Sequence, residues 1–381
     1  MNTRQIGGLT SLRFFAAFAI LLHHSQGIFV PEGYFNNTPF FGGVGFFFVL
    51  SGFILSHAHS SLSGARDITR FYISRVARLW PAHVVCTILI LCLIPYQASL
   101  LYSWNNIVIF FSNLFLVHSV IPVPIAYFSF NSVSWSISTE MFFYAAFPAL
   151  LVWLPSSPVA KYVAIVALGA ALAAALDYSG VPFFPSDNPQ GVTGHGLIYI
   201  SPVGRIQEFV LGILCHRFMA GIDRMSINFK FASTIEVMAV VAVILLSPVF
   251  AFWLRPYIGK ASPALFEFVR HTLLALLFAA MICFFYLDRG IVSKALSWRP
   301  LVLLGEISFS LYLIHQIFFR AASENHLLTG FSPFIRFSLV ASASIMVAYL
   351  IWRYVEKPCQ KWVMRTYDIA RPRSGQVEPT D

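Results

Sequence analysis

Charge is scarce in this sequence. Of its 381 residues only 11% are Asp, Glu, Lys or Arg, while 58% are hydrophobic and the mean hydropathy is +0.74. Soluble domains carry roughly 25% charged residues, so the composition excludes a soluble globular protein and indicates a membrane protein. No basic cluster is interleaved with aromatic residues outside the apolar segments, which argues against a nucleic-acid partner despite a net charge of +9.

Paired cysteines are also missing. The five cysteines form no CxxC motif and mostly lie within or at the ends of apolar segments, at positions 86, 92, 215, 283 and 359. This distribution argues against disulfides and against a metal site. The sequence lacks an internal repeat, and no small-residue cleavage site of a signal peptide follows its first apolar segment. We therefore expect this first segment to be retained in the membrane.

Long apolar segments make up most of the chain. Segments of about 20 residues, the length that crosses a bilayer, centre near residues 20, 50, 90, 113, 145, 168, 208, 242, 277, 311 and 344. Lys and Arg gather in alternate connections, namely 61–80, 216–230, 288–300 and the residues after 352, whereas 31–39, 96–133 and 178–200 contain none. The positive-inside rule places the basic connections in the cytoplasm and the others outside. Two basic residues in 254–268 depart from this rule.

The alternation of basic connections requires an even number of crossings. We exclude the segment 104–122, because its asparagines would need hydrogen-bonding partners inside lipid; excluding 160–177 instead would fit the later connections equally well. The sequence thus predicts an all-α polytopic membrane bundle of about ten transmembrane helices, with both termini in the cytoplasm. Residues 1–365 form the membrane-embedded domain, and 366–381 form a disordered cytoplasmic tail.

The first span carries ionisable residues. Arg13 and His24 are eleven residues apart, which places them within about 20° of each other around a helix and ~16 Å apart along its axis. His23 points about 100° away from His24. Buried ionisable groups in membranes are costly and usually functional, so we predict that Arg13 and His24 face the bundle interior. The alternatives are an arginine that snorkels to the surface and a histidine bound to a backbone carbonyl.

Two arginines lie at the predicted cytoplasmic start of the third span. Arg75 and Arg78 occupy adjacent turns of one face, and the planar guanidinium of arginine binds phosphate oxygens in bidentate fashion. The pair is a candidate phosphate clamp or, alternatively, an anchor for anionic lipid. The preceding span, GGVGFFFVLSGFILSH, contains small residues that include Ser51 and Gly52. These would let a thin ligand or a second helix approach closely.

Carboxylates occur within two later spans. Glu140 lies just inside the outward end of its span, where it would pair with an arginine or orient His24 in an acid–base dyad. Arg205 and Glu208 are one helical turn apart inside another span, so we predict an intrahelical ion pair.

A polar stripe follows one face of the span near residue 311. Ser308, Tyr312 and His315 recur at i, i+4 and i+7. Such a stripe forms hydrogen bonds between helices or lines a substrate channel.

In their order along the chain, these stretches resemble membrane acyltransferase family 3, the bacterial integral-membrane O-acyltransferases that modify carbohydrates. The matching motifs are Arg13 with His24, FFFVLSGF at 46–53, RxxR at Arg75 and Arg78 with Pro81, SWSIxxE…FY from Ser134 to Tyr144, RIQEFxxG at 205–212, LGEISFSLYLIH at 304–315 and EKP at 356–358. Ile137 and Phe309 stand where leucine and tyrosine are frequent in the family, without changing the chemistry. The matches run through most of the chain.

The resemblance implies transfer of an acyl group, acetyl in the first instance, from cytosolic acyl-CoA to a hydroxyl of an extracytoplasmic carbohydrate or lipid-linked glycan. The implied roles are catalysis by His24 with Glu140 and Arg13; binding of acyl-CoA by Arg75, Arg78, Ser51 and Gly52; and an acceptor site or channel formed by Trp135, Tyr144, Arg205, Glu208, Tyr312 and His315. It implies a multi-pass protein of the bacterial inner membrane without a tightly bound cofactor. We expect no hydrolase domain of the SGNH type after the last span.

Two other functions stay open at this point. A secondary transporter also carries intramembrane Arg, Glu and His, but it would be expected to show internal repeats, and the sequence has none. An inactive relative acting as a scaffold would not need the Arg13, His24 and RxxR residues, which are present. Direct transfer and a covalent acyl-enzyme on histidine, serine or tyrosine are both compatible with these residues.

Overall fold

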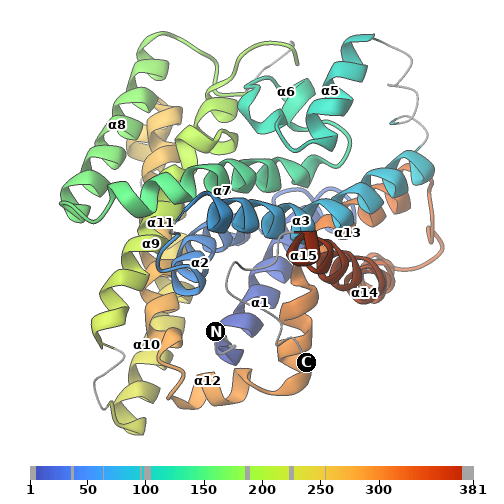
Figure 1. The fold of residues 1–381 in the computed structure, drawn as a ribbon. Helices are drawn as coiled ribbons and strands as arrows, with labels where there is room; N and C mark the ends of the chain where they lie inside the picture. The colour runs from blue at the N-terminus through green and yellow to red at the C-terminus, as the bar shows by residue number, and fades with distance from the viewer. Residues whose placement is uncertain are drawn as a thin grey trace, which may run out of the picture.

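A computed structural model describes residues 6–35, 38–62, 64–94, 97, 104–184, 189–222, 227–253 and 255–370. Its helices are α1 (Gly7–His24), α2 (Gly43–Ala58), α3 (Ala65–Leu93), α5 (Trp104–Leu114), α6 (Pro124–Tyr127), α7 (Trp135–Trp153), α8 (Pro158–Tyr178), α9 (Pro202–Ile222), α10 (Phe229–Pro248), α11 (Pro263–Tyr286), α12 (Ile291–Leu296), α13 (Arg299–Glu324), α14 (Pro333–Ile351) and α15 (Lys357–Ala370) (Figure 1). Short 3₁₀ or π-helical turns adjoin them: η1 (Phe40–Gly42), η3 (His118–Val120), η4 (Ser132–Ser134), η5 (Gly196–Ile200), η6 (Val249–Trp253), η7 (Arg255–Gly259) and η8 (Trp352–Glu356). No β-strand occurs among these residues, so the predicted all-α class is confirmed.

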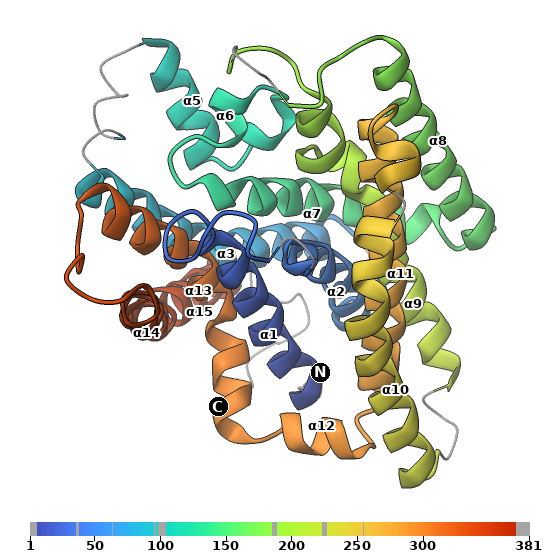
Figure 2. The ribbon, with the colours of Figure 1, turned by 180° about the vertical axis from the view of Figure 1, so that it is seen from behind.

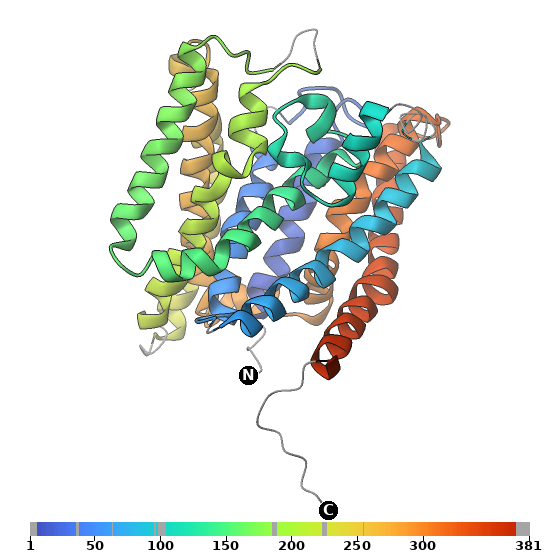
Figure 3. The same cartoon turned by 45° about the horizontal axis from the view of Figure 1, so that its top comes forward.

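Nine helical segments within the described residues are long and apolar enough to cross a membrane. They are Phe40–Ala58, Ala65–Leu93, Ser132–Trp153, Pro158–Tyr178, Gly196–Ile222, Phe229–Ile258, Pro263–Tyr286, Arg299–Glu324 and Pro333–Ala370. α1 is less apolar because it carries Arg13 and two terminal histidines, but it packs along α13 and against α2 in the middle of the bundle (Figure 3). Together with α1, the described residues thus contain ten helical segments that run through the bundle, which agrees with the prediction of about ten.

The segment around α5 does not cross the bundle. α5 has 11 residues, and a crossing needs about 20, whereas α8 has 21 residues and an almost wholly apolar sequence. The side-chain amide of Asn113 donates hydrogen bonds to the Ser129 carbonyl oxygen at 2.9 Å and to Ser134 Oγ at 3.2 Å. These partners satisfy the side-chain NH₂ of Asn113 within the protein, while its Oδ1 is buried without a partner among the described residues. The short helix α5 confirms the exclusion of 104–122, and α8 takes its place as a crossing.

The basic connections gather at one end of the bundle. The start of α1, the connection from α2 to α3, the end of α9 with the start of α10, helix α12 and the last turn of α15 all lie there (Figure 3). This grouping agrees with the even number of crossings, and the positive-inside rule makes it the cytoplasmic end. α15 remains helical to Ala370, five residues into the segment predicted as a tail, while Arg255 and Lys260 are exposed near the opposite end.

Close backbone contacts hold α2, which lines the site, against α9. A Cβ atom on Gly52 would lie 2.0 Å from the carbonyl oxygen of Phe209 in α9, and a Cβ on Gly212 would lie 2.0 Å from that of Val49 in α2. Only glycine permits this approach. Gly52 therefore serves helix packing, and its role in donor binding stays a prediction. α1 approaches α13 in the same way at Gly305.

Candidate functional site

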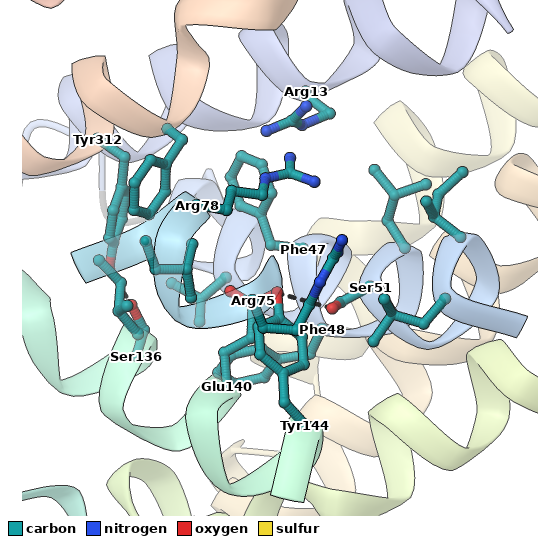
Figure 4. Close-up of a pocket in the computed structure, with 17 residues that line it drawn as sticks. Arg13, Phe47, Phe48, Ser51, Arg75, Arg78, Ser136, Glu140, Tyr144 and Tyr312 are labelled. Carbon is teal, nitrogen blue, oxygen red and sulfur yellow. Dashed lines mark hydrogen bonds between the residues drawn. The ribbon is translucent and has the colours of Figure 1, made fainter. Parts of the chain in front are cut away.

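Five helices, α1, α2, α3, α7 and α13, enclose a cavity of about 110 Å³. Its polar lining consists of Arg13, Ser51, Arg75, Arg78, Ser136, Glu140, Tyr144 and Tyr312. We call it the arginine cavity. Figure 4 shows Arg13 on one side, Glu140 and Tyr144 on the other, and Arg75 and Arg78 between them in this view. The structure thus brings together seven residues that the sequence singled out separately or in pairs.

Positive charge exceeds negative charge around the arginine cavity. Its one lining carboxylate, Glu140, accepts hydrogen bonds from Ser51 Oγ at 2.7 Å and from the Tyr144 hydroxyl at 2.5 Å. Within the described part of the chain, the guanidinium groups of Arg13 and Arg78 have neither a hydrogen bond nor an ion pair. Sheltered charges are costly unless they are paired. The cavity is therefore suited to an anion.

The arginine cavity lies toward the end with the basic connections. Its lining includes Ile54 and Leu55, within four residues of the end of α2. Just beyond that end, burial and the charges of Arg75 and Arg70 lower the pKa of His59 to about 4. His59 is consequently neutral at pH 7, and the arginines supply the positive charge in this region.

A second cavity of about 340 Å³ lies toward the opposite end of the bundle. Its polar and aromatic lining includes His23, His24, Gln26, Trp135, His195, Tyr199, Glu267, Arg270 and Tyr312. We call it the histidine cavity. Val44 and Tyr312 line both cavities, so the two meet at these side chains. The Tyr312 hydroxyl is held by Ser136 Oγ at 2.7 Å and by the Val133 carbonyl oxygen at 3.0 Å.

Two histidines from distant parts of the sequence form a pair beside the histidine cavity. His24 Nδ1 lies 3.0 Å from His315 Nε2, and His315 Nδ1 lies 3.2 Å from the carbonyl oxygen of Leu311. A carbonyl oxygen only accepts hydrogen bonds, so this pattern assigns the proton of a neutral His315 to Nδ1 and makes its Nε2 an acceptor. His24 then donates from Nδ1, which leaves His24 Nε2 unprotonated.

This arrangement corrects two predictions about the first span. Glu140 does not pair with His24, because Glu140 lines the arginine cavity and the hydrogen-bond partner of His24 is His315. His23 is not turned away from the site. It lines the histidine cavity together with His24, and its ring nitrogen is 3.4 Å from the amide of Gln26.

The ion pair predicted within α9 is present but lies behind the cavity walls. Arg205 Nε donates to Glu208 Oε2 at 3.0 Å, and the two side chains are 1% and 0% exposed. The Arg205 guanidinium lies 4.9 Å from the ring centre of Tyr199 and 5.3 Å from that of Phe48. Neither Arg205 nor Glu208 lines either cavity, and their place in an acceptor channel stays a prediction.

The remaining channel predictions have separate outcomes. Trp135 lines the histidine cavity, Tyr144 lines the arginine cavity, and Tyr312 lines both. His315 is fully buried and reaches the histidine cavity only through His24. Ser308 donates to the carbonyl oxygen of Gly305 in its own helix.

Several residues of the histidine cavity were not predicted. Glu267 and Arg270 form an ion pair on α11, and the Arg270 guanidinium lies 4.3 Å from the ring centre of Phe41. His195 stacks on Tyr199 with ring centres 4.8 Å apart. The sequence pattern that predicted the pair of Arg205 and Glu208 also occurs at Glu267 and Arg270. In both cases two ionisable residues lie one turn apart in an apolar span. Within the described residues, no group of three His, Cys, Asp or Glu side chains is arranged to hold a metal ion.

The fold and these cavities define a polytopic membrane protein in which an arginine-lined cavity adjoins a histidine-lined cavity inside the bundle. The chain belongs to membrane acyltransferase family 3, because the family's acyltransferase domain matches residues 6–353. It is therefore an acyltransferase of multi-pass membrane architecture.

Curated relatives agree with this assignment. The acyltransferase MdmB of Streptomyces mycarofaciens is 28% identical over 401 residues, which cover 96% of this chain and 94% of MdmB. The O-acetyltransferase OatA of Staphylococcus aureus (strain NCTC 8325 / PS 47) is 22% identical over 100% of this chain and 61% of its own length. The chain thus spans about three fifths of OatA. No solved structure matches the chain.

Proposed function

We propose that this protein transfers an acyl group, acetyl in the first instance, from cytosolic acyl-CoA to a hydroxyl of a carbohydrate on the outer side of the membrane. The observation that carries the proposal is the meeting of the two cavities at Val44 and Tyr312. One cavity presents three arginines against one lining carboxylate, and the other presents a histidine with an unprotonated nitrogen. An anionic donor and a hydroxyl acceptor require these two environments.

The donor binds through its phosphates in the arginine cavity. Acyl-CoA carries several phosphate charges, and guanidinium groups bind phosphate in bidentate fashion. Arg13, Arg75 and Arg78 approach the same cavity from α1 and α3. Glu140, tied to Ser51 and Tyr144, fixes the wall opposite Arg13. The acyl-bearing arm of the donor extends from this cavity toward Tyr312.

His24 acts as the general base. As the acceptor oxygen attacks the thioester carbonyl, its proton passes to His24 Nε2. The carbon–sulfur bond then breaks, the coenzyme A thiolate leaves, and protonated His24 returns the proton to that sulfur. General-base catalysis of this kind contributes roughly 10²–10⁴-fold. His315 holds the His24 tautomer through the 3.0 Å contact, as the carboxylate does in serine-hydrolase triads.

The acceptor binds in the histidine cavity. Aromatic side chains such as Trp135 and Tyr199 offer flat surfaces to a sugar ring, while Gln26, Glu267 and Arg270 offer hydrogen bonds to its hydroxyls. The bacterial relatives, one of them named as an O-acetyltransferase, support acetyl as the transferred group and the bacterial plasma membrane as the location.

The test is transfer of label by the purified protein in lipid nanodiscs. [¹⁴C]acetyl-CoA is mixed with saccharide fractions extracted from a strain that lacks the gene, and the label should enter a product from which mild base releases acetate. His24→Ala should lower this transfer by about 10²–10⁴-fold while leaving the affinity for acetyl-CoA unchanged. Accumulation of intact label inside sealed vesicles, without an ester product, would instead support a transporter.

A further inference from the structure

A third cavity, larger than the other two, opens on the side of the bundle. It is an apolar groove of about 540 Å³ between α1 and α10, with α2 and α11 behind it. Figure 2 shows α1 and α10 standing apart at this place, with α12 crossing below them. Residues such as Ala16, Ile244 and Phe278 line the groove. We call it the lateral groove, and it can hold a hydrocarbon chain.

The two ends of the lateral groove differ. Toward the basic end, Val292 and Leu296 of the short helix α12 belong to its lining. At the opposite end Thr38 lines both the lateral groove and the histidine cavity. The groove is thus contiguous with the proposed acceptor site. It shares no lining residue with the arginine cavity.

A buried hydroxyl group also lines the lateral groove. Ser247 lies at the end of α10, is 4% exposed and lines the groove. Its Oγ has no hydrogen-bond partner among the described residues. An unpaired buried hydroxyl is unfavourable, so a ligand that brings an oxygen atom to this point would satisfy it. A plain hydrocarbon would not.

We propose that the lateral groove binds the hydrocarbon chain of a lipid-linked saccharide whose sugar occupies the histidine cavity. The ester or phosphate oxygen that joins lipid and sugar accepts a hydrogen bond from Ser247. This inference rests on the proposed function, and it specifies the acceptor as a lipid-anchored glycan that enters sideways from the membrane. Phospholipid of the bilayer is the competing occupant.

The first experiment uses a bulky substitution that narrows the lateral groove. Ile244 and Leu245 are neighbours on α10 with 64% and 63% exposure, but only Ile244 lines the groove. Ile244→Trp should lower kcat/KM for a lipid extract from the gene-deletion strain by about tenfold, the effect of excluding roughly two methylene groups. Leu245→Trp should leave it unchanged, and both variants should keep the wild-type affinity for acetyl-CoA. Saccharide released from the same extract by mild acid should be a poorer acceptor for the wild type and insensitive to Ile244→Trp.

Equal effects of Ile244→Trp and Leu245→Trp, or equal use of intact and released acceptor by the wild type, would overturn the inference. The second experiment does not depend on catalysis. A maltoside with a photoreactive dodecyl chain should label groove residues of the wild type in nanodiscs, and Ser247→Ala should weaken the labelling. If phosphatidylcholine reduces the photolabelling as effectively as unlabelled maltoside does, the groove binds bulk lipid and the inference is overturned. Failure of the proposed function would appear differently, as absence of transfer from acetyl-CoA with the photolabelling pattern intact.

Discussion

Replacement of His315 should impair acyl transfer although this side chain reaches the substrate cavities only through His24. In the native protein His315 Nε2 lies 3.0 Å from His24 Nδ1 and accepts its hydrogen bond. His315→Leu removes this acceptor. Leaving a buried donor unpaired costs about 1–3 kcal/mol, so the catalytic orientation of His24 becomes less populated. At 1.36 kcal/mol per tenfold change, kcat should fall roughly 5- to 150-fold. His24→Ala removes the base itself and should cost about 10²–10⁴-fold.

The assay is label transfer from [¹⁴C]acetyl-CoA in nanodiscs, with kcat and KM measured for both substrates across a pH series. His315→Gln, whose amide oxygen accepts hydrogen bonds, should restore part of the rate and keep the shape of the pH profile. His23→Ala, which alters the cavity lining but not the histidine pair, should change mainly the acceptor KM. Wild-type kcat and pH profile in His315→Leu would refute the assigned tautomer and the role of the pair.

Other predictions concern the donor, the packing and the sidedness. Arg78→Ala should raise the Kd for acetyl-CoA roughly 10- to 100-fold by calorimetry, because a hydrogen bond to a charged group is worth about 1.5–3 kcal/mol, and Arg78→Lys should recover only part; unchanged Kd with lower kcat would contradict a phosphate clamp. Gly212→Ala should lower the melting temperature in detergent, since its Cβ would meet a backbone oxygen at 2.0 Å, whereas Gly221→Ala on the same helix meets nothing within 4 Å and should be neutral. In a cysteine-free background, Ser179→Cys should react with an impermeant thiol reagent in intact cells and Ser60→Cys only after permeabilisation; the reverse result would invert the topology.

The number and order of crossings could be predicted from sequence because bilayer physics acts on composition alone. A segment of about 20 apolar residues is required for a crossing, and the cytoplasmic loops retain Lys and Arg. Both signals are local in the chain. The choice between 104–122 and α8 also rested on composition, since asparagine within lipid needs a partner, and the side-chain NH₂ of Asn113 has its acceptors inside the protein.

The depth of a side chain could not be predicted in the same way. Position along a helix gives depth only when the helix is parallel to the membrane normal, and α7 runs obliquely across the bundle (Figure 3). Glu140, five residues after the start of α7, therefore reaches the arginine cavity rather than His24. His23 was misplaced for a related reason, because the last turn of α1 projects toward the histidine cavity and presents two adjacent side chains to it.

The histidine pair joins residues 291 positions apart, and no pattern within one segment indicates such a contact. Sequence reasoning found both members by the same rule, that polar groups in spans have functions, but it grouped His315 with Tyr312 as a channel stripe. Tyr312 and His315 both lie on α13 near the site. However, Tyr312 faces the cavities, whereas His315 faces α1. Only the packing of α1 along α13 turns one of these side chains into the partner of His24.

The proposed function also accounts for two separate cavities that share only Val44 and Tyr312 in their linings. Coenzyme A is anionic and cannot be released into or through an apolar bilayer at low cost, so its phosphates need to remain with the arginines at the basic end. Only the uncharged acyl-bearing arm has to pass Val44 and Tyr312. Hydrogen bonds to Ser136 and to the Val133 carbonyl oxygen hold the Tyr312 hydroxyl in place at this point. An acyl group can therefore reach the outer side while the donor's charge stays inside, and neither substrate has to cross the membrane.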